Sequence, residues 1–329
     1  MTATSTPGLV SVVVASYNHA RFLDRRMESL LAQTYAQLEI IVIDDRSPDN
    51  SVDVLRKYEA HPNVRLVVRE TNAGWVAVSN QGAELATGEY LLFANCDDAC
   101  EPEMIERLVA SLATNPTAGL AFCRSVMIDE QDAVITDDFA MREPAFRDFC
   151  RTDVLIPRAV MARFLLVACV IPNLSAALFR RQAFVDAGAL PPDYRACSDW
   201  DLFFRVVRDR DVAYVATPLN LFRQHRNTIR STTRDRVTLE EYLRLLLSHL
   251  HTIPMGLVER SRFRTEAMFL WAVHLLKPST AGFRDLPFHV RTVLRQDPAA
   301  LAFLPAGLAW RTGQLAWKLV TGRRAAVME

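Results

Sequence analysis

This sequence shows neither an excess of charge nor a pattern of paired cysteines. Its 38 basic and 38 acidic side chains cancel over 329 residues, so no overall attraction to nucleic acid is expected. The six cysteines include no CxxC pair, and the N-terminus lacks a basic region followed by an apolar one. We therefore expect free thiols in a cytoplasmic protein that does not bind nucleic acid.

Long apolar segments are also lacking. The longest uncharged candidate, Phe164 to Phe179, contains Pro172 and Asn173 and falls short of the ~20 apolar residues that a helix needs to cross a bilayer. We expect a buried strand with its approach loop in this segment. The composition, 50% hydrophobic and 23% charged, is ordinary for a globular protein, and the length predicts one large domain with a smaller appendage.

Strand and helix patterns alternate regularly in the first part of the chain. Apolar, β-branched runs predict buried strands at 9–16, 38–43, 64–68, 90–94 and 118–123. Helices are predicted between them at 19–33, 52–58, 74–86 and 101–114. In the first helix, charged residues such as Arg25 and Arg26 alternate with apolar ones, which indicates an amphipathic helix laid on a sheet. The alternation is typical of an open α/β sheet, which binds ligands beyond the carboxyl ends of its strands.

The pattern is less regular beyond residue 125. A hairpin is predicted at 126–135, few clear periods are found at 137–170, and further strands are predicted at 174–179, 212–216 and 219–222. Helices are predicted at 181–187 and 199–209, followed by a helical extension from about residue 238. Residues 1–8 are expected to be disordered.

The last predicted helix, at 308–321, carries tryptophans beside basic residues. Peripheral contact with the inner face of a membrane is one interpretation of this pattern. We favour the other interpretation, an ordinary helix packed on its neighbours. Nothing in the sequence indicates an oligomeric state.

Polar residues stand at the ends of three predicted strands: Tyr17-Asn18, Asp44-Asp45 and Asp97-Asp98. One crevice can contain all three, because the carboxyl ends of parallel strands meet at one edge. Adjacent carboxylates repel unless a cation lies beside them, and Mg²⁺ or Mn²⁺ would also bridge phosphate oxygens. An Asp at such a position also caps helices, so these residues alone leave a metal–diphosphate site and a helix cap open.

Several short motifs together carry a resemblance to a known family. They are Val14-Ala15-Ser16-Tyr17-Asn18, Ser29-Leu30-Leu31-Ala32-Gln33-Thr34, Ile43-Asp44-Asp45-Arg46-Ser47, Asn72-Ala73-Gly74 with Asn80, and Asp97-Asp98. In this order and spacing the sequence resembles the N-terminal half of family-2 glycosyltransferases with the GT-A fold. The match covers about residues 9 to 125, with weaker matches to about 231.

The resemblance implies a fold, a division of the chain and an activity. The fold would be a GT-A open, mostly parallel α/β sheet with a C-terminal helical extension. A glycosyltransferase domain would span 9–236, with a nucleotide-sugar half at 9–125 and an acceptor half at 126–236, before a helical region at 237–329. The activity would be inverting, metal-dependent transfer of one sugar from a nucleotide-diphosphate sugar to a hydroxyl of a glycan, glycolipid or protein, in bacterial-type surface glycan or glycolipid synthesis. The Gln-x-x-Arg-Trp pattern typical of processive synthases is absent, which favours single-sugar transfer.

The resemblance also implies roles for residues near the donor. Ala15 and Tyr17 would line the nucleotide pocket, and Asn80 would lie near the donor. Asp45 would accept a hydrogen bond from the base, which favours a UDP-sugar, while Asp44 would help to shape the turn.

Further roles follow for the acidic pair after the fourth strand. Asp97 would meet the ribose or sugar of the donor, and Asp98 would coordinate Mg²⁺ or Mn²⁺ bridging the diphosphate. The family often has another Asp before this pair, where this sequence has Cys96.

A later motif, Ser198-Asp199-Trp200-Asp201, resembles the family's acidic motif before a helix, with Ser198 in place of the first acid. It makes Asp199 the candidate general base, with a helix N-cap as the alternative role. Asp201 is expected to be structural.

His225 lies in the segment Arg223-Gln224-His225-Arg226. It would ligate the metal or contact the diphosphate, with Arg223 or Arg226 adding positive charge, and a structural histidine is the alternative.

Two other functions are weighed against glycosyl transfer. A sugar nucleotidyltransferase would normally carry a glycine-rich loop near its N-terminus, and Ser16-Tyr17-Asn18-His19-Ala20 has no glycine. A non-catalytic nucleotide- or sugar-binding protein would keep the pocket but tolerate the loss of Asp199.

Overall fold

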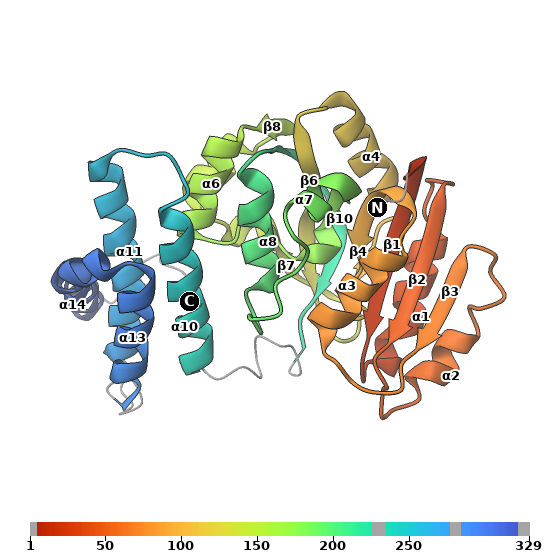
Figure 1. Ribbon diagram of the computed structural model, residues 1–329, viewed down its shortest axis with the longest axis horizontal. Helices are drawn as coiled ribbons and strands as arrows, with labels where there is room; N and C mark the ends of the chain where they lie inside the picture. Colours follow the sequence, from red (N-terminus) through yellow and green to blue (C-terminus); the bar gives the residue numbers. More distant parts are fainter. Residues whose placement is uncertain (1–4, 226–234, 277–283, 322–329) are drawn as a thin grey trace. The chain divides into compact units, whose positions relative to one another are not determined.

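Ten strands form one sheet in the computed structural model of the protein, which describes residues 5–225, 235–276 and 284–321 (Figure 1). The order along the sheet is β3-β2-β1-β4-β9-β6-β10-β5, with β7 paired to β6 and β8 to β10. The strands are β1 (Thr6–Ser16), β2 (Leu38–Asp44), β3 (Val64–Val68), β4 (Gly88–Phe93), β5 (Ala99–Cys100), β6 (Ala118–Ile128), β7 (Val134–Asp137), β8 (Val154–Ile156), β9 (Ala177–Arg180) and β10 (Asp211–Arg223).

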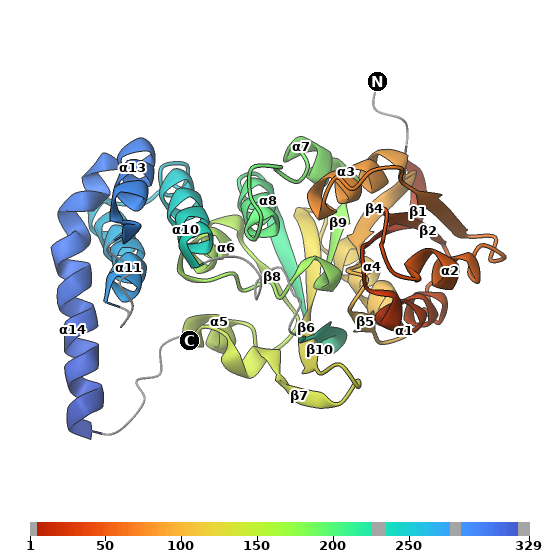
Figure 2. The same ribbon diagram turned by 90° about the horizontal axis from the view of Figure 1, so that it is seen from below.

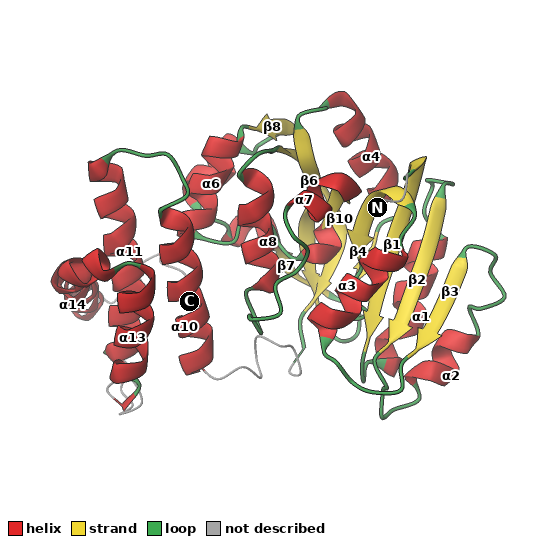
Figure 3. Cartoon of the chain, viewed as in Figure 1, coloured by secondary structure: helices red, strands yellow, loops and turns green. Residues whose placement is uncertain are grey.

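The sheet is mixed, and its longest parallel run is β3-β2-β1-β4. β1 runs parallel to β2 and β4, β2 to β3, and β6 to β10, whereas β9 runs antiparallel to both of its neighbours, β4 and β6. Figure 3 shows these strands together with the helices that cover them. The predicted open, mostly parallel α/β sheet is confirmed.

Two layers of helices cover the sheet because its strands are apolar on both faces (Figure 2). One layer contains α1 (Ala20–Leu31), α2 (Ser51–Arg56) and α4 (Met104–Thr114), whose buried apolar residues share one core cluster with Val10, Val12 and Val14 of β1. The other contains α3 (Trp75–Leu85), α7 (Arg181–Asp186) and α8 (Ser198–Val207). A Cβ atom at Gly82 of α3 would lie 2.2 Å from Cγ1 of Val13, so this glycine allows α3 to approach β1 closely.

The carboxyl ends of β1, β2 and β4 meet at one edge of the sheet. Ser16 is paired with Asp44, and the Asp45 N–H donates to the Ser16 carbonyl at 2.9 Å. On the other side of β1, the Ala94 N–H donates to the Val13 carbonyl at 2.8 Å. The three polar strand ends identified in the sequence therefore lie along the same edge, as predicted.

The segment 137–170 is more regular than the sequence indicated. It contains η1 (Asp138–Met141), α5 (Pro144–Phe149), β8 and α6 (Arg158–Val167). The segment Phe164 to Phe179 was expected to be a strand and its approach loop, but it begins inside α6. Short apolar runs do not distinguish a buried helix from a buried strand, which explains this error.

Three other boundaries also differ from the predictions. β1 begins at Thr6, so the expected disorder at 1–8 is wrong for residues 6–8, and residues 1–4 lie outside the described part. The predicted strand at 174–179 begins as η2 (Leu174–Ala176), because the Asn173 side chain accepts from the Ala176 N–H at 3.2 Å. The two strands predicted at 212–222 form one strand, β10, whose register shifts near Pro218.

The chain divides into two compact units. The first comprises Met1–Asp193 and Ser198–Thr228 and holds the sheet; the second comprises Tyr194–Cys197 and Ile229–Glu329. The second contains α10 (Asp235–Leu250), α11 (Leu257–Leu275), α13 (Leu286–Gln296), η3 (Pro298–Phe303) and α14 (Leu304–Thr321), which confirms the C-terminal helical extension. Leu243, Leu247, Met268, Trp271 and Val293 lie in its apolar core.

No helix in the described ranges is both long and apolar enough to span a bilayer. Trp310 of α14 is 44% exposed, and its ring centroid lies 4.6 Å from that of Phe269. The side chains from residue 313 onward, including Trp317, lie outside the described part of the chain. Membrane contact through this helix therefore stays a prediction.

The second unit also buries two histidines. His289 of α13 is fully buried, and its ring centroid lies 5.2 Å from the ring centroid of His274 of α11. The Nε2 atom of His274 lies 3.9 Å from Oδ2 of Asp285. The His289 ring further lies 3.4 Å from the Arg236 carbonyl of α10. Burial is the main cause that lowers the pKa of His289, and the neighbouring His274 lowers it further.

We expect the stability of the protein to fall as the pH drops below about 6.5, the usual pKa of an unfolded histidine. The unfolded chain then takes up a proton that buried His289 resists, which steepens the pH dependence by at most about 1.4 kcal/mol per pH unit. Denaturant unfolding between pH 7.5 and 5.5 measures this slope. The variant His289→Gln should show a shallower slope, and an unchanged slope would contradict the assignment.

Candidate active site

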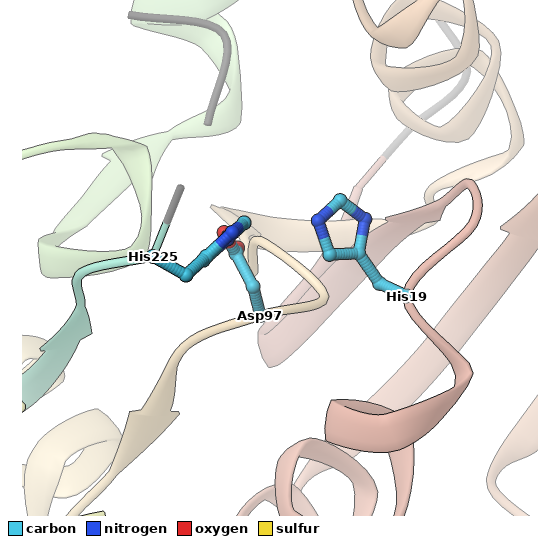
Figure 4. Close-up of side chains that lie close together, drawn as sticks. All are labelled: His19, Asp97 and His225. Atoms are coloured by element: carbon cyan, nitrogen blue, oxygen red, sulfur yellow. The ribbon is translucent and has the colours of Figure 1, made fainter. Parts of the chain in front are cut away.

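Three side chains from distant parts of the sequence meet near the carboxyl ends of β1, β4 and β10 (Figure 4). They are His19, Asp97 and His225, and one ligand atom from each lies within 4.8 Å of the others. The Nε2 atom of His225 lies 2.9 Å from Oδ2 of Asp97. The ring centroids of the two histidines are 5.2 Å apart. Asp97 and His225 are predicted from the sequence, whereas His19 is not, although it directly follows the Tyr17-Asn18 strand end.

Hydrogen bonds orient the side chains of this cluster. The Nδ1 atom of His19 lies 2.6 Å from the Tyr17 carbonyl, which can only accept, so Nδ1 carries a proton and Nε2 is left as the ligand atom. The His225 side chain is buried, whereas 21% of the Asp97 side chain is exposed. Burial raises the pKa of Asp97, but the hydrogen bond from His225 and the nearby His19 outweigh it, so this pKa lies below its usual value.

The cluster has a donor set that fits a divalent cation. Carboxylate oxygens suit Mg²⁺ and Mn²⁺, while imidazole nitrogens favour transition metals. Two imidazoles and one carboxylate therefore match Mn²⁺ better than Mg²⁺.

Asp98 points away from the cluster into the protein. It is 1% exposed, and its Oδ2 atom accepts from Ser175 Oγ at 2.6 Å, Asn173 Nδ2 at 2.7 Å and Asn95 Nδ2 at 3.2 Å. Its Oδ1 atom accepts from the Arg223 N–H at 2.9 Å. Burial and the Asp97 carboxylate raise the pKa of Asp98 to about 6. Metal binding by Asp98 stays a prediction, and these contacts favour Asp97 as the ligand.

A buried arginine supports the loop that carries both aspartates. Arg26 of α1 is fully buried, and it donates to the Asn95 carbonyl at 2.8 Å and to Ser175 Oγ at 3.1 Å. This role of Arg26 is not predicted from the sequence, where Arg26 is one of the charged residues of an amphipathic helix. Its position four residues after Phe22 and four before Leu30, both buried, places it on the apolar face of the helix, and this spacing was the available signal.

Arg223 ties the end of β10 to the same loop. Its side chain is 1% exposed and donates through Nε to the Asp97 carbonyl at 2.7 Å, and it also pairs with Asp132. The guanidinium carbon lies 4.6 Å from the centroid of the Phe22 ring. The predicted contribution of Arg223 to diphosphate binding therefore lacks support from its contacts, and Arg226 lies outside the described residues.

The residues predicted to hold the nucleotide lie at the ends of β1 and β2. Tyr17 is 45% exposed and Ala15 is half-buried. Asp44 accepts from the Ser47 N–H at 2.8 Å and the Ser47 hydroxyl at 2.6 Å, and it thereby holds the turn after β2.

Asp45 holds a neighbouring loop. It is 2% exposed, accepts from the N–H groups of Ala73 and Gly74 at 2.9 and 2.8 Å, and lies 3.1 Å from Arg69 Nε. A contact between Asp45 and the base stays a prediction.

The two remaining predicted site residues of the first unit, Asn80 and Asp199, lie on α3 and α8. The Asn80 amide donates to the Leu190 carbonyl at 2.9 Å and accepts from the Leu190 N–H at 3.0 Å. Asp199 lies in the first turn of α8, where its Oδ1 atom accepts from the backbone N–H of Trp200 at 2.8 Å. Asp201 binds Arg205 Nε at 2.7 Å, consistent with the structural role predicted for it.

We expect Arg26→Met to lower the free energy of unfolding by about 3 kcal/mol, because it leaves the buried Asp98 carboxylate without a nearby positive charge. The control Arg25→Met, whose side chain is 45% exposed, should cost less than about 1 kcal/mol. The double variant Arg26→Met/Asp98→Asn should lose less free energy of unfolding than the two single variants lose together. The reason is that the negative charge that Arg26 compensates is gone. Denaturant unfolding of the wild-type protein, the double variant and the single variants Arg26→Met, Asp98→Asn and Arg25→Met measures these differences, and simple additivity would contradict the coupling.

Comparison with known sequences connects this site to a family. A family model described as Glycosyl transferase family 2 matches residues 11–184. The chain is 31% identical to EpsH of Bacillus subtilis over 229 residues, which cover 67% of this chain and 62% of that protein. It is 40% identical to the glycosyltransferase YibD of Escherichia coli over 117 residues, which cover 35% and 33% of the two chains. The matches thus span less than two thirds of the length of these relatives.

Solved structures share the fold. A crystal structure of Staphylococcus aureus TarS 1–349 in complex with UDP-GlcNAc aligns with a TM-score of 0.72 at 15% identity, covering 96% of this chain and 92% of that chain. The mannosyltransferase PcManGT from Pyrobaculum calidifontis, in complex with GDP-Man and Mn²⁺, aligns with a TM-score of 0.51 at 17% identity, covering 94% and 87%. These similarities support the GT-A fold. Because the family model matches more than half of the chain, the protein belongs to glycosyltransferase family 2.

Proposed function

We propose that the protein transfers a single sugar from a nucleotide-diphosphate sugar, with a UDP-sugar favoured, to a hydroxyl acceptor with inversion at the anomeric carbon. The observation that carries this proposal is the cluster of His19, Asp97 and His225 near the carboxyl ends of β1, β4 and β10, in a chain of glycosyltransferase family 2. In open α/β sheets ligands bind at this edge. The UDP-GlcNAc bound to TarS is consistent with a UDP-sugar donor.

The proposed metal ligands are Asp97, His19 and His225, with Mn²⁺ favoured over Mg²⁺. The ionised Asp97 carboxylate and the two imidazoles converge, and a bound ion would take the place of the hydrogen bond between His225 and Asp97. Asp98, the ligand expected from the sequence, already accepts three hydrogen bonds at Oδ2 and one at Oδ1, which a metal bond would have to displace in part. When bound, the ion would neutralise the negative charge that develops on the leaving diphosphate.

Asp199 is the proposed general base. Its carboxylate takes the proton of the acceptor hydroxyl while the hydroxyl oxygen forms a bond to the anomeric carbon. The bond from that carbon to the diphosphate oxygen breaks on the opposite side, and the nucleoside diphosphate leaves. Attack opposite the leaving group produces inversion of the sugar.

We place the acceptor-binding residues in the parts of the chain for which the family resemblance implies no residue roles. We assign acceptor binding to residues 137–170, which form η1, α5, β8 and α6, together with the helices of the second unit. The acceptor would be a glycan, glycolipid or protein in bacterial-type surface glycan synthesis. The reaction would take place in the cytoplasm or at the inner face of a membrane.

Donor binding is tested by thermal shift with UDP-GlcNAc, UDP-glucose, GDP-mannose, dTDP-glucose and CMP-sialic acid, each with and without Mn²⁺. A ligand at a hundred times its dissociation constant stabilises the native state by about 2.7 kcal/mol, so one donor should raise Tm clearly. Asp97→Asn should remove the part of this shift that depends on Mn²⁺, whereas Asp24→Asn, a change at the surface ion pair with Lys57, should not. No Mn²⁺-dependent shift with any donor would contradict the proposed metal site.

The general base is tested with Asp199→Asn and the control Asp209→Asn, an exposed residue beyond the end of α8. Loss of a general base lowers kcat by about 10²- to 10⁴-fold. We expect this decrease in Asp199→Asn, and we expect the donor to raise the Tm of this variant as it does for the wild-type protein. Release of nucleoside diphosphate, with water as the acceptor, measures the rate. Unchanged turnover in Asp199→Asn would rule out this base, and a wild-type protein that binds donors without turnover would be a non-catalytic binding protein.

A further inference from the structure

The connection between α7 and α8 leads directly to the proposed base. It spans residues 187–197, contains no helix or strand, and is followed by Ser198 and Asp199 in the first turn of α8. Side chains of the first unit hold its beginning: Arg205 donates to the Ala187 and Ala189 carbonyls, and Asn80 pairs with Leu190. The Ser198 hydroxyl also donates to the Pro191 carbonyl at 2.9 Å.

A single buried carboxylate holds the end of this connection. Glu241 of α10 is 2% exposed and accepts from three successive backbone N–H groups. Its Oε1 atom lies 2.7 Å from the Arg195 nitrogen, and its Oε2 atom lies 2.9 Å from Ala196 and 3.1 Å from Cys197. Hydrogen bonds to an ionised acceptor are roughly twice as strong as neutral ones. The carboxylate therefore fixes the backbone of residues 195–197.

A second side chain of the same helix holds the residue before them. The guanidinium carbon of Arg244, one turn after Glu241, lies 3.9 Å from the centroid of the Tyr194 ring, which is 8% exposed. This distance is well within the range of cation–π contacts. Residues 194–197 belong to the second unit together with α10, although the chain on both sides of them belongs to the first.

We propose that Glu241 is a positioning residue for the proposed base. It fixes residues 195–197. Because the backbone continues directly into Ser198 and Asp199, it also sets the position of Asp199 in the first turn of α8. The inference rests on the proposed function, in which Asp199 takes the proton of the acceptor.

The chemistry of a carboxylate makes this role testable with a nearly isosteric change. In Glu241→Gln one oxygen becomes an NH₂ group that faces backbone N–H donors, so at least one of the three hydrogen bonds is lost. A displacement of about 1 Å at a catalytic group costs about 10²-fold in rate. We expect kcat to fall about 10- to 100-fold while KM for the donor stays unchanged. Glu266→Gln, which removes a carboxylate paired with Arg262 on α11, is the matched control.

Amide hydrogen exchange tests the structural part without any assay of activity. The amides of residues 195–197 should be protected in the wild-type protein and should exchange about tenfold faster in Glu241→Gln, with no change in Glu266→Gln. Arg244→Met, which keeps the carboxylate and removes the ring contact, should accelerate exchange to a smaller extent. Unprotected amides at 195–197 in the wild-type protein would overturn the proposal even if no variant folded.

A double-variant experiment tests whether Glu241 acts through Asp199. The rate measured is hydrolysis of the nucleotide sugar that the wild-type protein turns over fastest in the donor panel. Glu241→Gln should lower this rate in the wild-type background and have no further effect in Asp199→Asn, because the group that it positions is gone. Effects that multiply would overturn the proposal. A normal rate in Asp199→Asn contradicts the proposed base, whereas a loss in Asp199→Asn without a loss in Glu241→Gln contradicts only the positioning by Glu241.

Discussion

The buried carboxylate of Asp98 is the interaction on which the site depends. It accepts hydrogen bonds from the loop after β4, from the turn before β9 and from the end of β10, three segments far apart in the sequence. Arg26 of α1 adds a positive charge to this network through Ser175. A buried carboxylate is costly unless its hydrogen bonds are complete, so the surrounding chain has little freedom to rearrange. Asp97, the next residue along the chain, is thereby held where it meets His19 and His225.

Adjacent carboxylates thus have different tasks. Asp98 is saturated with protein donors, whereas part of the Asp97 side chain remains exposed beside two imidazoles. A strand end that turns sharply separates consecutive side chains, so one faces the core and the next faces the ligand edge. This division explains why an Asp-Asp pair serves the site even though its two charges repel. The proposed metal ligands also include a histidine from each of two other chain segments.

Much of the fold could be predicted from the sequence, because buried parallel strands and amphipathic helices have distinct periods. The edge of the sheet where Tyr17, Asp44 and Asp97 meet followed from that alternation. The antiparallel β9 and the helices α5 and α6 did not, because their short apolar segments fit either type of structure. Which of Asp97 and Asp98 faces outward could not be decided, since both residues have the same chemistry and only the tertiary partners Asn173, Ser175 and Arg223 distinguish them.

Three buried carboxylates in the described part of the chain accept hydrogen bonds from backbone N–H groups of other segments. Asp45 binds two N–H groups of the loop before α3, Asp98 binds the Arg223 N–H, and Glu241 binds three N–H groups before α8. An irregular segment leaves its backbone donors unpaired, and an ionised acceptor satisfies several of them at once. The hydrogen bonds of Asp45, Asp98 and Glu241 thus hold the fold. The acids proposed for chemistry are close in sequence to these contacts: Asp97 precedes Asp98, and Asp199 follows the segment that Glu241 holds. Which acidic side chain is left to contact a ligand thus depends on the donors that surround it in the fold, a property that a sequence motif does not encode.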